Sequence, residues 1–316
     1  MPVKNLRIVF AGTPDFAAEH LSALLVHDCN VIGVYTRQDK ISGRGQKITA
    51  SPVKELALSH NITVFQPANF RNQEDVDQLA ALKPDVLVVV AYGVILPKTV
   101  LDLPEYGCIN IHGSLLPKYR GAAPIQRSIF NGDRTTGITV MKMNEGLDTG
   151  NIIHTKTIDI LDTDTSESLF TRLVPLGCSA LLEALEMIAE DRVEETPQND
   201  SLACYAEKIT REEAKIDFSE SADQISRRIR TYIPWPVANF KIGNEILKVH
   251  QAAVSSEETS APPGTVISAD KSGIHVATGN GVLVIKQLQF AGKKPTKVAD
   301  VLNGHRDLFK AGTLLT

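Results

Sequence analysis

The 316-residue sequence has few of the features that mark secreted or membrane proteins. Its four cysteines are scattered, without the spacing of a metal site or an obvious disulfide framework, which favours reduced structural thiols. No apolar run approaches the roughly 18 residues that a membrane span requires. The N-terminus leads directly into the strand-like segment Leu6–Phe10, so we expect no cleavable signal. These absences predict a cytoplasmic protein with no membrane partner.

The sequence also lacks the motifs of two common cofactor sites. The turn after the first expected strand is Gly12-Thr13-Pro14, which is not the G-x-G-x-x-G fingerprint of a dinucleotide site. This absence disfavours a nucleotide-dependent oxidoreductase. The eight histidines show no metal-ligand spacing, so we expect no metal site.

Charge is divided unevenly along the chain, whose net charge is -4. Residues 209–316 carry 14 Lys+Arg and 11 Asp+Glu, a net charge of +3, whereas residues 1–208 carry 19 and 26, a net charge of -7. This asymmetry leaves room for a phosphate-binding surface on the second part. An ordinary solvated surface gives a difference of the same size.

The first part of the chain alternates expected strands and helices. The strands are residues 6–10, 31–35, 63–65, 86–90 and 108–112, and the run Val86–Val90 is apolar throughout, as in a sheet buried on both faces. A long helix at about 165–190 closes this region. The pattern predicts an α/β domain with a doubly wound, mostly parallel sheet over residues 1–190. The polar segment 191–208 is expected to be a linker.

Residues 209–316 have a different pattern. One helix is expected at 222–230. Five short β-like segments follow, separated by turns, at residues 238–242, 246–251, 264–267, 273–277 and 282–288. Short strands at this spacing predict a small β-barrel.

The segment from Gly107 to Gly121 carries the most informative polar residues. Asn110 and His112 are two residues apart in an expected strand, so they project from the same face. Ligands of open α/β sheets bind beyond the carboxyl ends of the strands. An amide can donate to a developing oxyanion and an imidazole can exchange protons near neutral pH, so the two form a candidate catalytic pair. Residues of these types also satisfy backbone groups at strand ends, and spacing alone does not distinguish the two interpretations.

A second polar cluster contains Asp148 between two turn glycines, Gly146 and Gly150. A simple Asx-turn is one explanation of this pattern. The other is that the turn brings Asp148 to His112, where its carboxylate fixes the ring tautomer and favours the imidazolium. The pattern itself leaves both open.

The same residues carry a family resemblance. The run from Gly107 to Arg127, GCINIHGSLLPKYRGAAPIQR, resembles the signature of folate-dependent formyltransferases, and Gly137–Met141 and Gly146–Gly150 match the family in order and distance. The similarity extends over almost the whole chain and resembles the branch that formylates methionine carried by initiator tRNA. Its further segments are FAGTPDFA at 10–17, GRGQK at 43–47, SPVK at 51–54, YAEKI at 205–209, PWP at 234–236, APPGT at 261–265 and AGKK at 291–294.

The resemblance implies a catalytic domain of the formyltransferase type, followed by a C-terminal barrel like those that bind oligonucleotides. It implies 10-formyltetrahydrofolate as co-substrate, methionyl initiator tRNA as acceptor in translation initiation, and a monomer. Asn110 and His112 would stabilise the oxyanion, and Asp148 would hold His112 and help to remove the proton of the amine. The implied folate contacts are Ser114, Leu115, Leu116 and Pro117, with Val90 and Tyr92 in the wall of the pocket. Plain core packing is the other interpretation of these hydrophobic residues, and we favour it for most of Val86–Val90.

A basic loop at residues 37–47 is long for a βα connection. A solvated flexible loop is one interpretation. In the resembling family this loop enters the acceptor arm of the tRNA, and Arg44 matches the key basic residue. Residues 38–42 replace a more proline-rich stretch, so we expect a more mobile loop with its charge intact. The implied tRNA contacts are Arg44, Lys47, Lys208, Lys248, Lys293 and Lys294, and further basic candidates are Arg227, Arg228, Arg230, Lys286 and Lys297.

Two other functions are compatible with parts of this pattern. One is a related folate-dependent formyltransferase that acts on a small amine or a sugar nucleotide, and the other is a non-catalytic RNA-binding protein on the same scaffold. The basic loop and the β-rich tail favour tRNA, because a small acceptor needs no clamp. The set of Asn110, His112 and Asp148 favours an enzyme, because a binding protein needs no proton relay.

Overall fold

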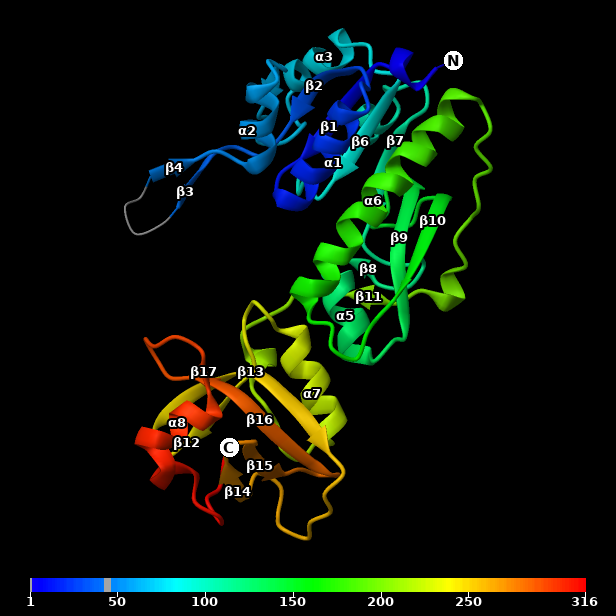
Figure 1. Ribbon diagram of the computed structural model, residues 1–316. Helices are drawn as coiled ribbons and strands as arrows, with labels where there is room; N and C mark the ends of the chain where they lie inside the picture. Colours follow the sequence, from blue (N-terminus) through cyan, green and yellow to red (C-terminus); the bar gives the residue numbers. More distant parts are fainter. Residues whose placement is uncertain (1, 43–46) are drawn as a thin grey trace. The chain divides into compact units, whose positions relative to one another are not determined.

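The computed structural model describes residues 2–42 and 47–316, without the side chains of residues 40–42, 47 and 48. The chain divides into two compact units (Figure 1). The first unit consists of residues 1–124, 135–158 and 171–206, and the second of residues 125–134, 159–170 and 207–316. The second unit is therefore built from three separate segments of the chain.

The first unit contains a seven-stranded sheet in the order β10-β9-β7-β6-β1-β2-β5. The five strands from β7 to β5 are parallel, and β9 runs antiparallel to β7. This mostly parallel sheet confirms the predicted α/β class. The strands are β1 (Ile8–Gly12), β2 (Val31–Tyr35), β5 (Val64–Phe65), β6 (Val86–Val90), β7 (Cys108–His112), β9 (Thr135–Lys142) and β10 (Ile152–Asp159).

Apolar side chains on both faces of the central strands explain the helices around them. Val9, Leu87 and Val89 pack in one cluster with the apolar residues of α3 and α4, while the alternating Ile8 and Val88 are also fully buried. The helices of this unit are α1 (Asp15–Val26), α2 (Pro52–Ser59), α3 (Gln73–Ala81), α4 (Lys98–Leu101) and most of α6 (Ser166–Ala189).

Helix α6 is long and apolar enough to cross a membrane if only length and composition are considered. Its leucines at helical spacing are fully buried within the protein, namely Leu169, Leu173, Leu181 and Leu185. On another side of the helix, Glu183 accepts a hydrogen bond from Lys156 of β10 at 2.5 Å. Helix α6 therefore has a buried apolar stripe and a polar side, as a core helix of a folded domain does.

The second unit contains an antiparallel sheet in the order β12-β13-β16-β15-β14, with β17 paired to β16. This half-barrel encloses a core of its own together with α7 (Ala222–Thr231) and α8 (Val298–His305). Ser221 and Gln224 form a capping box that starts α7. The predicted β-rich C-terminal fold is confirmed. Its strands are β12 (Asn239–Ile242), β13 (Glu245–Ser255), β14 (Val266–Asp270), β15 (Gly273–Ala277), β16 (Val282–Gln289) and β17 (Thr296–Lys297), and α5 (Pro124–Asn131) contributes all but its first residue to this unit.

Several strands and pairings were not anticipated from the sequence, among them the eight-residue strands β9 and β10 of the main sheet. Two others are pairings of very short strands. Within the expected loop 37–47, β3 (Lys40–Ser42) pairs with β4 (Lys47–Thr49) as an antiparallel hairpin. Within the expected linker, β11 (Tyr205–Ala206) pairs in parallel with β8 (Arg120–Gly121). Both pairings involve strands of two or three residues, which are too short to show a hydrophobic period.

Candidate active site

Strand β7 positions Asn110 and His112 in the centre of the sheet of the first unit. The backbone partners of Asn110 are Val89 of β6 and Met141 of β9. The Asn110 side chain is half-buried, and its Nδ2 donates to the Val89 carbonyl at 3.2 Å. Because an amide nitrogen carries two hydrogens, the second one can donate to a ligand.

The His112 ring is 7% exposed and has a defined tautomer. Its Nε2 lies 2.8 Å from the carbonyl oxygen of Tyr119. A carbonyl only accepts, so Nε2 carries the hydrogen, and Nδ1 of the neutral ring has the free lone pair. Tyr119 is in the left-handed region at φ 63°, and its N–H donates to Cys204 Sγ at 3.3 Å. The Tyr119 carbonyl therefore fixes the tautomer. The sequence had suggested Asp148 for this role.

Asp148 lies beside the other nitrogen of the ring. Its Oδ2 is 3.7 Å from His112 Nδ1, and its side chain is 16% exposed. This distance is too long for a hydrogen bond, but the carboxylate is close enough to stabilise a proton that arrives on Nδ1. The same oxygen accepts from the Gly121 N–H at 2.7 Å, and the Asp148 backbone is left-handed at φ 53°.

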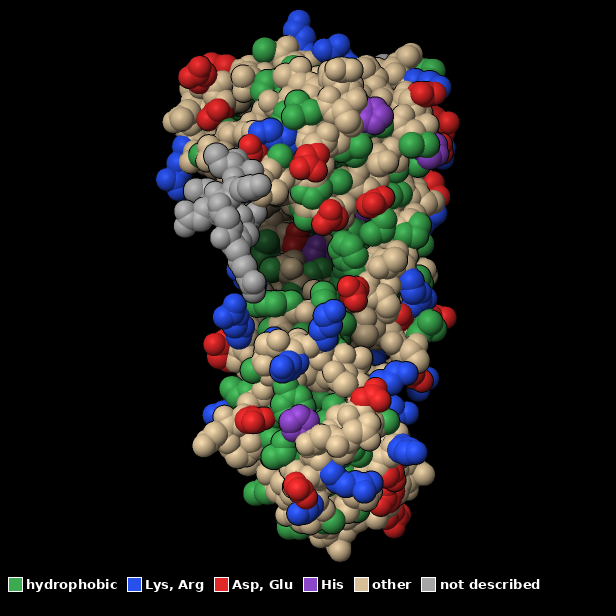
Figure 2. All heavy atoms as spheres, turned by 60° about the vertical axis from the view of Figure 1, so that its left-hand side comes forward, with side chains coloured by type: hydrophobic (Ala, Val, Ile, Leu, Met, Phe, Trp, Pro, Cys, Tyr) green, Lys and Arg blue, Asp and Glu red, His purple; other side chains and the backbone are tan. Residues whose placement is uncertain are grey.

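The structure thus brings the amide, the imidazole and the carboxylate to one end of β7. Figure 2 shows a hollow in the surface where an imidazole and an acidic side chain are visible on the floor. Such an arrangement offers a hydrogen-bond donor and a proton acceptor to a ligand from neighbouring positions.

The loop after β7 contains four of the expected folate contacts, Ser114, Leu115, Leu116 and Pro117. The Ser114 hydroxyl is buried and donates to the Lys118 carbonyl at 2.7 Å. Thr139 of β9 donates to the Ser114 carbonyl at 2.7 Å and accepts from the Leu116 N–H at 3.0 Å. These bonds fix the backbone of the loop, while Leu115 and Pro117 stay partly exposed.

The other two expected folate contacts, Val90 and Tyr92, have side chains in the core. They are 0% and 2% exposed, and Tyr92 belongs to the same cluster as Tyr35. Burial raises the pKa of the Tyr92 phenol, whose hydroxyl has no hydrogen-bond partner. The surface at this strand end is formed by Ala91 and Gly93 instead. In this conformation the Val90 and Tyr92 side chains offer almost no surface to a ligand.

The expected tRNA contacts are spread over both units. Arg44 and the side chain of Lys47 lie outside the described residues. Lys208 and Lys248 are exposed residues of the second unit. Two further exposed cations, Lys293 and Lys294, line a hollow of about 910 Å³ that also contains the stacked rings of Phe290 and His305.

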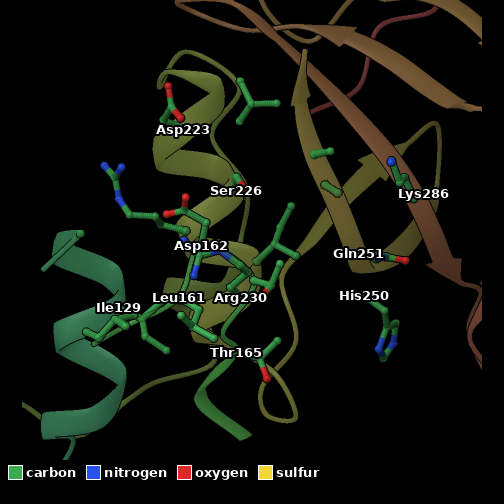
Figure 3. Close-up of a pocket in the computed structure, with 18 of the residues that line it drawn as sticks. Ile129, Leu161, Asp162, Thr165, Asp223, Ser226, Arg230, His250, Gln251 and Lys286 are labelled. Carbon is green, nitrogen blue, oxygen red and sulfur yellow. The ribbon is translucent and has the colours of Figure 1, made fainter. Parts of the chain in front are cut away.

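The second unit also contains a groove of about 770 Å³. In Figure 3, Ser226 and Arg230 project from α7, and Gln251 of β13 and Lys286 of β16 lie across from them. The groove has cations and acids in its lining: Arg134, Arg227, Arg230 and Lys286, and Asp133, Asp162 and Asp223.

Arg230 is a cation of this groove with a buried and unsatisfied donor. Its Nη1 donates to the Asp164 carbonyl at 2.7 Å, but its Nε is buried and has no hydrogen-bond partner. Burial lowers the pKa of the guanidinium, which nevertheless stays protonated at neutral pH. A buried donor of this kind can be satisfied by an anion. By contrast, Arg228 is engaged by Glu220 at 2.5 Å and lies over the ring of Phe130.

Two features near the catalytic set were not identified from the sequence. Gln198 and Arg120 form a hydrogen-bonded network next to Asp148, and Thr139 fixes the loop from Ser114 to Pro117. No local pattern marks them, because each acts through partners that are distant in sequence. Among the residues that the structure describes, no three His, Cys, Asp or Glu side chains are grouped as metal ligands.

Fold and site together define an α/β enzyme domain with its polar site at the carboxyl end of a central strand. The sequence model of the formyl transferase family, "Formyl transferase", matches residues 6–185, and "Formyl transferase, C-terminal domain" matches residues 208–306. The first match covers more than half of the chain. The chain therefore belongs to the formyl transferase family.

Solved structures with the same fold include three formyltransferase-related proteins at low identity. WlaRD, a sugar 3N-formyl transferase solved with dTDP and 5-N-formyl-THF, is 20% identical with a TM-score of 0.65, over 92% of this chain and 99% of its own. The N-formyltransferase of Helicobacter canadensis, solved with folinic acid and dTDP-3-aminofucose, is 20% identical with a TM-score of 0.66, over 89% and 98%. HypX of Aquifex aeolicus, solved with tetrahydrofolic acid, is 17% identical with a TM-score of 0.63, and the chain covers 47% of its length.

The chain spans about half the length of the HypX chains that it matches. It covers nearly the full length of the two sugar N-formyltransferases. At 17–20% identity these likenesses establish the fold. The catalytic roles and the acceptor are proposed below from the residues of the site.

Proposed function

We propose that this protein transfers the formyl group of 10-formyltetrahydrofolate to the α-amino group of methionine on initiator tRNA, in the cytoplasm and as a monomer. The observation that carries the proposal is the meeting of Asn110, His112 and Asp148 in a domain of the formyl transferase family. Two observations support tRNA as the acceptor. Almost the whole chain resembles the branch of the family that acts on initiator tRNA, and the second unit carries exposed cations.

The proposed reaction begins with attack of the methionine amine on the formyl carbon. As the new C–N bond forms, negative charge develops on the formyl oxygen. The free N–H of Asn110 Nδ2 is the donor for this oxyanion, because only one of the two amide hydrogens is used by the Val89 carbonyl. Collapse of the intermediate breaks the bond to the folate nitrogen and leaves formyl-methionine on the tRNA.

The proton of the attacking amine needs an acceptor. His112 Nδ1 has a free lone pair, because Nε2 donates to the Tyr119 carbonyl. When Nδ1 takes the proton, the imidazolium gains the Asp148 carboxylate at 3.7 Å. The protonated ring then donates to the oxyanion or to the leaving folate nitrogen.

A direct transfer is favoured over an acyl-enzyme because the sequence has no motif of an activated Cys or Ser nucleophile. The thiol on the strand of Asn110 and His112 is also unsuited to attack. Cys108 is 1% exposed, and burial raises its pKa to about 12. Its Sγ faces the carbonyls of Val100 and Leu101 at 3.8 Å. A protonated, buried thiol is not a nucleophile at neutral pH.

The proposed folate site lies along the loop from Ser114 to Pro117. Its backbone is fixed by Thr139, so it can present Leu115 and Pro117 to a planar ring without reordering. The folates in the solved structures of WlaRD, the Helicobacter enzyme and HypX support a folate donor. Val90 and Tyr92 would support this site from the core.

The proposed tRNA contacts are Arg44 and Lys47 in the basic loop, and cations of the second unit. Arg230 has a buried, unsatisfied N–H, and Lys286 lies in the same groove. Phosphate groups are ligands that can satisfy such donors. Exposed Lys208, Lys248, Lys293 and Lys294 complete the proposed contacts.

A second candidate is transfer to the amino group of a sugar nucleotide. It is favoured by the near-complete coverage of WlaRD and of the Helicobacter enzyme, which were solved with dTDP and dTDP-3-aminofucose respectively. Both candidates use the same donor and the same catalytic set, so they differ only in the acceptor.

Competition between acceptors distinguishes the two candidates. Purified protein is given 10-formyltetrahydrofolate labelled in the formyl group, together with charged initiator tRNA, charged elongator methionine tRNA or dTDP-3-aminofucose. The proposal expects label on methionine of the initiator tRNA, with much less on the elongator tRNA. Label on the amino sugar alone would establish the second candidate, and no transfer to any amine would refute both.

A further inference from the structure

Behind Asp148 lies a hydrogen-bonded network that closes on the turn carrying the carboxylate. Gln198 Nε2 donates to the Asp148 carbonyl at 2.9 Å and to the Gly150 carbonyl at 2.7 Å. Both hydrogens of one amide are therefore used to hold two carbonyls of the same turn. All these residues belong to the first unit.

The orientation of the Gln198 amide is fixed by Arg120. The Gln198 Oε1 accepts from Arg120 Nε at 3.0 Å and from Nη2 at 2.9 Å. A guanidinium only donates, so the oxygen of the amide must face it and the nitrogen must face the turn. The Arg120 side chain is 4% exposed, and Nη2 also donates to Asp200, whose side chain is 84% exposed.

The network matters because the Asp148 turn is held in an uncommon conformation. Asp148 has φ 53°, a left-handed value that is costly for a residue with a side chain unless its surroundings hold it. In this conformation Oδ2 accepts from the Gly121 N–H at 2.7 Å and faces His112 Nδ1 at 3.7 Å. A shift of about 1 Å in such a group can reduce a rate about 100-fold.

We propose that Gln198 is a positioning residue for Asp148, locked in its working orientation by the buried guanidinium of Arg120. Gln198 lies in the polar segment 191–208, which the sequence indicated as a linker. This segment therefore helps to position the Asp148 carboxylate. The inference rests on the proposed role of Asp148 in formyl transfer, and it adds two residues that do not touch the reacting atoms.

The test removes the hydrogen-bond donor of Gln198. In Gln198→Glu the carboxylate still accepts from Arg120, but it cannot donate and it repels the two carbonyls. We expect kcat for formyl transfer to fall about 10- to 100-fold, with KM for 10-formyltetrahydrofolate within twofold of the wild type. Gln198→Met removes the donor without the repulsion. Gln73→Glu, an exposed glutamine of the same unit, is the matched control and should be unchanged.

Hydrogen exchange supplies a readout that does not depend on the acceptor. The Gly121 amide donates to Asp148 Oδ2, so its exchange reports the position of the carboxylate. We expect exchange at Gly121 to be at least tenfold faster in Gln198→Glu, with a much smaller change at the amides of the second unit. Asp148→Asn keeps an acceptor for Gly121 but loses the charge, so it should lose activity without that change in exchange.

The outcomes separate the two proposals. Loss of activity in Asp148→Asn together with wild-type kcat in Gln198→Glu would overturn the positioning role alone. Unchanged Gly121 exchange in Gln198→Glu would overturn it as well, whatever the rate. Wild-type activity in Asp148→Asn would instead refute the catalytic role of Asp148.

Discussion

The polar groups of the two units are held in different ways. In the first unit, His112 and Asp148 are mostly buried, and each is fixed by backbone partners, the Tyr119 carbonyl and the Gly121 N–H. In the second unit, the cations expected to meet phosphate are exposed, like Lys248, or line an open groove, like Lys286. Chemistry at one atom needs groups fixed within a fraction of an ångström, whereas attraction of a polyanion acts over about 10 Å and tolerates mobile side chains.

This contrast predicts different responses to mutation. Substitutions at the fixed groups of the first unit should abolish a step, while substitutions at the cations of the second unit should change affinity by small, additive amounts.

The largest effect is expected at the catalytic set. Asn110→Ala, His112→Ala and Asp148→Ala should each lower kcat about 10²- to 10³-fold, because a preorganised donor or proton acceptor is lost. Steady-state formyl transfer measures this effect, and circular dichroism checks that each variant is folded. A variant with near-normal turnover would refute the role assigned to its residue.

A second large effect concerns pH and a histidine of the first unit. His20 is fully buried, and its Nδ1 donates to the Phe16 carbonyl at 2.7 Å. Burial lowers its pKa from 6.5 to about 4, so the unfolded chain binds this proton more tightly than the folded one. Stability should therefore fall as the pH drops from about 6.5 to 4, by up to about 3 kcal/mol.

Denaturant unfolding at several pH values tests the histidine effect. The His20→Leu variant should lose this part of the pH dependence. Hydrogen exchange should show that α1 and α6 lose protection at pH 5, whereas the strands of the second unit retain it. Equal loss in both units would contradict the assignment to His20.

A third prediction uses two glycines. In Gly150→Ala the new Cβ would overlap the Lys142 carbonyl beside the Asp148 turn, so the variant should lose about 1–3 kcal/mol of stability. In Gly304→Ala, within α8, the Cβ meets open space, and the helix should gain about 0.5–1 kcal/mol. Thermal unfolding of both variants measures the difference, and a tolerated Gly150→Ala would show that the turn is not closely packed.

A smaller and selective effect is expected in the basic loop. Arg44→Leu removes one proposed charge-assisted contact with tRNA, so kcat/KM for the tRNA should fall roughly tenfold. The KM for 10-formyltetrahydrofolate should not change. An equal loss for both substrates would argue against a tRNA contact at this loop.

The smallest effect is expected in the groove of the second unit. Lys286→Ala should weaken tRNA binding modestly and reduce the slope of log affinity against log salt by about 1. Binding titrations measure this slope. They run from about 50 to about 200 mM salt, where a protein that contacts several phosphates loses much of its affinity. A wild-type slope in the variant would exclude Lys286 from the phosphate contacts.

The sequence predicted those parts of the fold that local patterns determine. The segments Val31–Tyr35, Val86–Val90 and Cys108–His112 were placed as strands with the bounds that the structure has, because each is short, rich in β-branched residues and bounded by turns. The spacing of Asn110 and His112 also placed them on one face of a strand. The two-residue strands β8 and β11 have no such pattern and were missed.

The parts of the site that were not predicted depend on contacts between distant segments. The Tyr119 carbonyl fixes the His112 tautomer through a turn whose backbone φ the sequence does not give. Gln198 reaches the Asp148 turn from 50 residues away, in a stretch with no periodicity. Tyr92 faces the core, although the family resemblance implied that it lines the folate pocket. Tertiary packing decides such orientations, and composition does not.

The most direct test is a single-turnover measurement of formyl transfer from 10-formyltetrahydrofolate to methionyl initiator tRNA, comparing the wild type with Asp148→Asn. The substitution keeps the shape of the side chain and an acceptor for the Gly121 N–H, and it removes only the charge beside His112 Nδ1. We expect rapid transfer by the wild type and a chemical step at least 100-fold slower in the variant. Equal rates in the two proteins would refute the proposed role of the Asp148 carboxylate.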